Sequence, residues 1–120
     1  MKLETFQRYE TELVEAATAI LAQRNVAYAE NDDYLANFRR ISRATGLTPA
    51  KVCEVYMQKA LTAMSKLLNG QDVPGETMTE RFADMFNYVK LAYAICREDN
   101  SPAPSLWEER HPLRRVRDVM

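Results

Sequence analysis

The stretch that decides the fold is TMTERFADMFNYVKLAYAIC, which occupies residues 77–96. Its apolar residues recur every three or four positions, which is the spacing of a helix. They form two stripes, of which one contains Phe82, Met85, Phe86, Val89, Tyr93 and Cys96, and the other Tyr88, Leu91, Ala92 and Ile95. A helix that is apolar on more than one face is typical of the centre of a helical domain. We therefore expect a central helix over about residues 78–98, begun by a capping box between Thr77 and Glu80.

Three further helices are expected before this central one. Apolar residues at helical spacing predict the first over about residues 3–23 and leave a polar stretch from Asn25 to Asp33. The second follows a cap at Asp32 or Asp33 and ends at a glycine. The third begins at a threonine cap followed by proline and ends at a second glycine. Residues at these later boundaries are Gly46, Thr48, Pro49 and Gly70, and the shared face of the second helix contains Leu35, Phe38 and Ile41.

Composition favours one soluble helical domain. The chain has 120 residues, of which 47% are hydrophobic, and no stretch alternates as a strand does. We expect an all-α, four-helix bundle-like domain over residues 1–99 and an extended or partly ordered tail over residues 100–120, which contains prolines and arginines.

Charge and cysteine content exclude several classes of protein. The 16 basic and 17 acidic residues nearly cancel, which argues against binding of nucleic acid or membrane by bulk positive charge. No apolar run is long enough to span a membrane, so a cytoplasmic protein is expected. Cys53 and Cys96 lie among apolar neighbours and are interpreted as buried, reduced thiols. The single histidine, His111, leaves no ligand pair for a metal site.

Polar residues within the apolar pattern are the candidates for function. Lys59 lies midway along the third helix, and Asp84 and Asn87 lie within the fourth. Because an isolated buried charge is unstable, such residues indicate an ion pair between Lys59 and Asp84, a ligand, or an exposed stripe. In the functional interpretation Lys59 binds phosphate, and Asp84 or Glu80 binds a metal ion or acts as a base. In the alternative, each side chain points to solvent.

The acidic run Glu30-Asn31-Asp32-Asp33, followed by Tyr34, is a second candidate. Clustered carboxylates suit Mg²⁺, although the spacing is not that of a calcium loop. The alternative is a solvated loop that caps a helix.

Two further segments suggest partners. Residues 40–52 resemble a helix-turn-helix, but the second helix offers only Lys51 to DNA, and Glu54 would repel phosphate. The tail carries one aromatic residue and several arginines that could contact an acidic partner, or that form a solvated terminus. The partner-binding candidates there are Trp107, Arg114, Arg115 and Arg117.

The order of several short motifs resembles small helical domains encoded by bacteriophages, of the "nucleotide modification associated" type. The motifs are Asp33-Tyr34, Asn37-Phe38, Gly46-Leu47-Thr48-Pro49, Lys59 and Asp84-Met85-Phe86-Asn87-Tyr88, and they span about residues 10–97. The resemblance implies a viral protein that acts in the host cytoplasm and binds a nucleotide or related phosphate ligand. The ligand-binding residues that it implies are Lys59, Asp84, Asn87, Tyr88, Glu80, Asp33 and Tyr34.

Such domains are distantly similar to the MazG-like all-α nucleotide pyrophosphohydrolases, in which two acidic pairs hold Mg²⁺ against a triphosphate. The segment from Glu80 to Asp84 is similar to the second pair, but it is one residue longer, and Arg81 stands where a glutamate is expected. The first pair is missing, since Glu54 is followed by Gln58 and Lys59. The resemblance therefore implies binding without full pyrophosphohydrolase activity, with no catalytic residue assigned and with Mg²⁺ only as the companion of a nucleotide.

Two alternatives stay open beside ligand binding. The first is a protein-interaction module or inhibitor of a host factor, including host defence, and the second is a DNA-binding helix-turn-helix. A homodimer is compatible with each of them, because the largely apolar central helix can leave a face for a second copy to cover.

Overall fold

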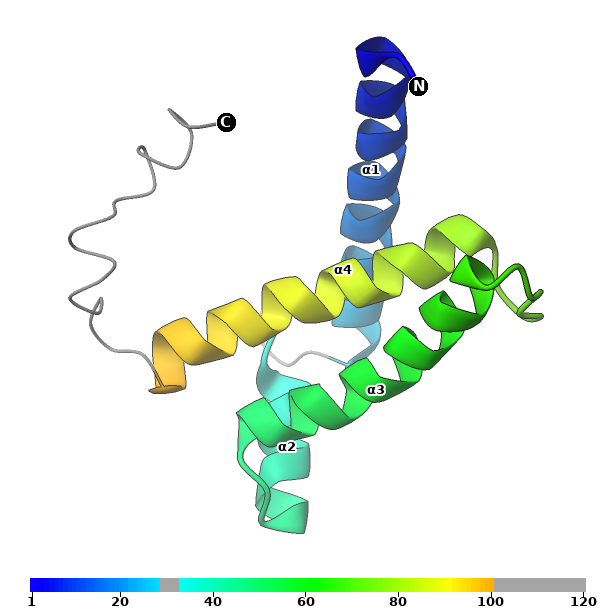
Figure 1. The fold of residues 1–120 in the computed structure, drawn as a ribbon. Coiled ribbons are helices and arrows are strands. Elements are labelled where there is room, and N and C mark those ends of the chain that lie inside the picture. Colours follow the sequence, from blue (N-terminus) through cyan, green and yellow to red (C-terminus); the bar gives the residue numbers. More distant parts are fainter. Residues whose placement is uncertain (29–32, 101–120) are drawn as a thin grey trace, which may run out of the picture.

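The computed structural model describes residues 1–28 and 33–100 and shows an all-α domain of four helices that pack together, which confirms the predicted fold class. The helices are α1 (Leu3–Tyr28), α2 (Ala36–Thr45), α3 (Pro49–Leu68) and α4 (Met78–Ile95), and α4 continues into one π-helical turn, η1 (Cys96–Asn100). In Figure 1, α3 and α4 form the front layer, with α1 and α2 behind them. Within the described residues, no helix has the length and apolar character needed to cross a membrane.

Helix α4 is the centre of the domain, as its apolar pattern predicts. It packs against α3 on one side and against α1 on another, and its Ala83 and Ile95 are fully buried. Helix α1 reaches α4 with its C-terminal half, where Ala17 is fully buried. The N-terminal half of α1 extends beyond the other helices, and Leu3 there is exposed (Figure 1).

The predicted end of the first helix is wrong, because α1 continues to Tyr28 rather than stopping near residue 23. Residues 24–28 contain neither glycine nor proline, so nothing in the sequence interrupts the backbone hydrogen bonds of the helix. Most of the acidic run, residues 29–32, lies outside the described residues.

The hydrophobic core joins α2, α3 and the end of α4, through Leu35, Phe38, Val52, Cys53 and Ile95. The Cys53 thiol lies 3.7 Å from the backbone oxygen of Tyr88, to which it donates a hydrogen bond. Burial, with a smaller contribution from the nearby Cys96, raises the pKa of Cys53 to about 11, so this thiol stays protonated and unreactive at neutral pH.

Cys96, in contrast, is exposed, which contradicts the prediction of two buried thiols. It belongs to the α4 stripe that contains Val89 and Tyr93, both of which are exposed as well. The apolar pattern of the sequence does not show which part of a stripe another helix covers, and at these three positions none of the described helices buries the side chain.

The helix boundaries mostly follow the predicted caps. Thr48 accepts a hydrogen bond from the Lys51 amide at 3.1 Å and caps α3. Gly46, which follows α2, takes the left-handed φ of 78° that favours glycine. Asp33 differs from the prediction, because it precedes the N-terminal cap position of α2, which Leu35 occupies. The Asp33 carboxylate instead accepts a hydrogen bond from the Leu35 amide at 2.9 Å and closes the turn before the helix.

The predicted capping box of α4 is confirmed. The Thr77 hydroxyl accepts a hydrogen bond from the Glu80 amide at 3.1 Å, and the Glu80 carboxylate accepts from the Thr77 amide at 3.3 Å. Replacing Thr77 by alanine should lower the free energy of unfolding by about 1 kcal/mol, because an amide of the first turn loses its partner. Thermal unfolding followed by circular dichroism measures the effect.

The matched control for that prediction is Thr79→Ala, two residues further on in the first turn of α4, where no cap hydrogen bond is lost. Equal effects of the two substitutions would contradict a capping role for Thr77.

Candidate ligand pocket

A pocket of about 550 Å³ is lined by residues from all four helices. Loop residues before α2 and before α4 complete the wall. The lining residues are Leu21 and Arg24 of α1; Tyr34; Asn37, Phe38 and Arg40 of α2; Tyr56, Lys59, Ala60 and Ala63 of α3; Glu76; and Arg81, Asp84, Asn87, Tyr88 and Leu91 of α4.

Five of the seven ligand-binding candidates from the sequence line this pocket together: Tyr34, Lys59, Asp84, Asn87 and Tyr88. The ion pair between Lys59 and Asp84, one of the arrangements that the sequence allowed, is not formed, because Asp84 pairs with Arg24 of α1 instead. Lys59 is exposed at the pocket and has no ion-pair partner among the described residues. The two residues thus share an open pocket rather than closing on each other.

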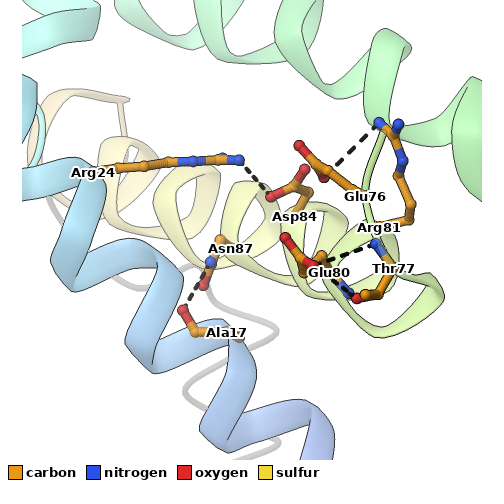
Figure 2. A network of polar contacts seen from close by, with 8 residues as sticks. All are labelled: Ala17, Arg24, Glu76, Thr77, Glu80, Arg81, Asp84 and Asn87. Carbon is orange, nitrogen blue, oxygen red and sulfur yellow. Dashed lines mark hydrogen bonds and ion pairs between the residues drawn. The ribbon is translucent and has the colours of Figure 1, made fainter. Parts of the chain in front are cut away.

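The other two candidates, Glu80 and Asp33, are not among the lining residues. The Glu80 carboxylate is engaged in the capping box of α4, where it accepts from the Thr77 amide and hydroxyl (Figure 2). The Asp33 carboxylate accepts from the Leu35 amide and lies 4.0 Å from the Arg39 side chain. Both carboxylates therefore stabilise local structure in this arrangement.

An ion pair between Arg24 and Asp84 connects α1 to α4 at the pocket wall. The Arg24 guanidinium lies 2.7 Å from Asp84 Oδ1, and only 14% of the Asp84 side chain is exposed. Figure 2 shows Arg24 reaching across to Asp84, with the Glu76 carboxylate close beside it. Burial raises the pKa of Asp84 above its ordinary value of 3.8, Arg24 opposes this rise, and Glu76 adds to it.

The loop before α4 holds Glu76 in place beside Asp84. Arg81 donates a hydrogen bond to the Pro74 backbone oxygen at 2.8 Å, and its other terminal nitrogen lies 3.9 Å from the Glu76 carboxylate (Figure 2). Gly75 has a φ of 104°, in the region that favours glycine, so the loop can turn back over Arg81. Each of the two carboxylates at the pocket therefore faces an arginine.

Asn87 supplies an unsatisfied acceptor. Only 2% of the surface of this residue is exposed, and its Nδ2 donates a hydrogen bond to the Ala17 backbone oxygen at 2.9 Å. That hydrogen bond fixes the orientation of the amide (Figure 2). Its Oδ1 has no hydrogen-bond partner within residues 1–28 and 33–100. A buried acceptor without a partner is costly, so a ligand that brings an N–H or O–H donor would be stabilised here.

Aromatic rings line the side of the pocket formed by α2, α3 and α4. Tyr56 packs edge-on against Phe38 and stacks in parallel on Tyr88, with ring centroids 6.1 Å apart in both pairs. Burial is the main cause that raises the pKa of Tyr88 above its ordinary value of 10.0, so its hydroxyl stays a neutral donor and acceptor. Such rings offer flat surfaces to a planar ligand.

Four charged residues of the pocket were not predicted as ligand-binding residues: Arg24, Arg40, Glu76 and Arg81. Arg24 could have been found, since it lies seven residues after Ala17 on the same face of α1. Glu76 carries no such signal, because its position depends on the conformation of a loop. The partner-binding candidates of the tail, Trp107, Arg114, Arg115 and Arg117, lie outside the described residues.

Comparison with protein-family models, with curated proteins and with solved structures finds no match to this chain. Within the described part of the chain, no three histidine, cysteine, aspartate or glutamate residues gather as a group that could hold a metal ion.

The raised pKa of Asp84 predicts how stability depends on pH. Between pH 3.8 and the higher pKa in the folded state, the folded protein binds more protons than the unfolded chain. The contribution of Asp84 to the free energy of unfolding therefore falls as pH rises through this window. The difference in this free energy between the wild type and Asp84→Asn should be larger at about pH 4 than at about pH 7, as measured by urea unfolding.

Asp72→Asn, in the exposed loop after α3, is the control and should show no such change between the two pH values. If the wild type gains stability over Asp84→Asn as pH rises, the attraction of Arg24 outweighs burial and the assignment is wrong.

Proposed function

We propose that this protein binds a nucleotide, or a similar ligand with a planar ring and a phosphate, in the pocket between its helices. The observation that carries the proposal is the unpaired Lys59 at a pocket whose acidic groups already face arginines. A flexible lysine without a partner is a common ligand for phosphate.

The charge of the lining supports an anionic ligand. Four cationic side chains line the pocket, from Arg24, Arg40, Lys59 and Arg81, against the two carboxylates of Glu76 and Asp84. Positive charge in a concave site attracts anions more strongly than the same charge on a flat surface. The site can therefore favour phosphate even though the whole chain is nearly neutral.

The uncharged groups support a ring with hydrogen-bond donors. Asn87 lines the pocket and its Oδ1 has no partner among the described residues, so it offers an acceptor to the N–H groups on the edge of a nucleobase. Tyr34 and Tyr56, both partly exposed at the pocket, offer faces on which a base can stack. A nucleotide carries a phosphate, a planar ring and donors in one molecule.

The resemblance to phage-encoded domains of the nucleotide modification type leads to the same ligand class. It also makes a viral origin and action in a host cytoplasm part of the proposal. Binding rather than full pyrophosphohydrolase activity is favoured because Glu80 is engaged in a cap and Arg81 replaces an expected glutamate. Mg²⁺ belongs to the proposal only as the companion of a bound nucleotide.

The DNA-binding alternative has less support. The Lys51 ammonium, the first cation of the would-be recognition helix, lies 2.8 Å from the Glu54 carboxylate. That pair reduces the positive charge available to a phosphate backbone.

The experiment is a thermal-shift assay with nucleoside mono-, di- and triphosphates, with nucleosides, and with inorganic phosphate. At least one nucleotide should raise Tm by several degrees, since a ligand at 100 times its Kd stabilises the folded state by about 2.7 kcal/mol. In Lys59→Ala the shift should be lost, because the unpaired cation at the pocket is removed.

Lys66→Ala provides the matched control, because Lys66 lies two turns further along α3, is exposed and does not line the pocket. It should keep the full shift. Absence of a shift in Tm with every nucleotide in the wild type would contradict nucleotide binding. An unchanged shift in Lys59→Ala would contradict the proposed role of Lys59 in the site.

A further inference from the structure

The outer side of the α3–α4 layer presents a continuous apolar surface, which we call the hairpin face. Its residues recur every three or four positions along both helices, so each set lies on one side of its helix. They are Leu61, Met64 and Leu68 of α3, and Met78, Phe82, Met85, Val89 and Tyr93 of α4.

The hairpin face lies opposite the pocket. On α3 the pocket is lined by Tyr56, Lys59, Ala60 and Ala63, none of which belongs to the hairpin face. On α4 it is lined by Asp84 and other residues that are not members of the face either. In Figure 1, α1 and α2 lie behind the α3–α4 layer, and no helix of the described residues covers its front. By helical spacing the hairpin face is the side of α3 and α4 turned away from the pocket-lining residues, and five of its members are exposed.

The exposure of this face is unusual for a monomer. Leu61, Leu68, Met78, Val89 and Tyr93 are between 42% and 70% exposed, and the other members are half-buried. Together they present on the order of 700 Å² of accessible surface, which exceeds the ~300–600 Å² of the largest apolar patch on a typical monomer. A standard stable interface covers about 800 Å² on each partner, so this face is nearly large enough for one.

The chemistry of the face favours a second copy of the same chain. None of its eight positions carries a charge, so it offers no charged group that would select a partner of opposite sign. Three of the six methionines of the chain lie on it, and their flexible side chains adapt to an opposing apolar surface. Two identical hairpins related by a two-fold axis bury the same surface on both sides, which is the commonest symmetry of soluble oligomers.

We infer that the chain forms a homodimer in which the hairpin faces of two copies pack against each other. The interface contains two helices from each copy and has the packing of a four-helix bundle. Both pockets remain open, since they lie on the far side of the α3–α4 layer. Dimerisation is therefore independent of ligand binding and is tested separately from it.

Size-exclusion chromatography with light scattering tests the inference on the full-length chain. The wild type should show twice the mass of one chain, and Leu61→Glu combined with Val89→Glu should show the mass of one chain, because charges enter a dry apolar interface. The single substitution Tyr93→Lys, at a position that is 68% exposed, should weaken the dimer without touching the core. Circular dichroism confirms that the variants remain helical.

Val55→Glu is the matched control, because Val55 is 56% exposed on α3 but lies away from the hairpin face. It should remain a dimer. A monomeric wild type overturns the inference, as does a dimer that persists in Tyr93→Lys and in the double variant. Dissociation by Phe6→Glu on α1, with the hairpin variants still dimeric, would place the interface elsewhere and overturn it too.

Discussion

The arrangement of this domain depends on the close crossing of α1 and α4. Two alanines, Ala17 and Ala83, are fully buried, and small side chains allow two helix backbones to approach. At the same crossing, Asn87 of α4 donates to the backbone oxygen of Ala17. This hydrogen bond selects one register of α1 on α4, because sliding either helix would leave a buried amide without a partner.

The register of that crossing sets the chemistry of the pocket. With Ala17 against Asn87, Arg24 lies two turns further along α1 and reaches Asp84 of α4. The Arg24–Asp84 pair and the Arg81–Glu76 pair then account for both carboxylates of the lining. Lys59, which comes from α3, pairs with neither of them, and for this reason the proposed function assigns the phosphate to it. The polar side of the α3–α4 layer thus suits a small ligand, whereas the apolar side suits a second copy.

Much of the fold could be predicted from sequence, because the relevant signals are local. The Thr77–Glu80 capping box, the Thr48-Pro49 start and the glycine after α2 each act within a few residues, and all are confirmed. Five candidates share the pocket. Lys59, Asp84 and Asn87 were found because polar residues within an apolar helical pattern must be paired, exposed or bound to a ligand, whereas Tyr34 and Tyr88 are motif residues of the resemblance.

The remainder depended on contacts that are distant in sequence. Ending the first helix near residue 23 placed Arg24 in a loop, and only the continuation of α1 to Tyr28 directs it toward α4. The position of Glu76 follows from a glycine turn rather than from periodicity. Sequence alone does not show which apolar face of α4 another helix covers, which is why Cys96 was expected to be buried and is in fact exposed, as are Val89 and Tyr93.

Ligand binding in this pocket is tested most directly by an NMR titration of the ¹⁵N-labelled protein with the nucleotide that gives the largest shift in Tm. If the nucleotide binds in the pocket, the chemical shifts of the Asn87 side-chain amide and of the backbone amides around Lys59 should change and reach saturation. Signals of Leu61 and Val89, on the opposite side of the same two helices, should stay in place. Saturable changes confined to other regions, with the Asn87 amide unaffected, would contradict ligand binding in this pocket.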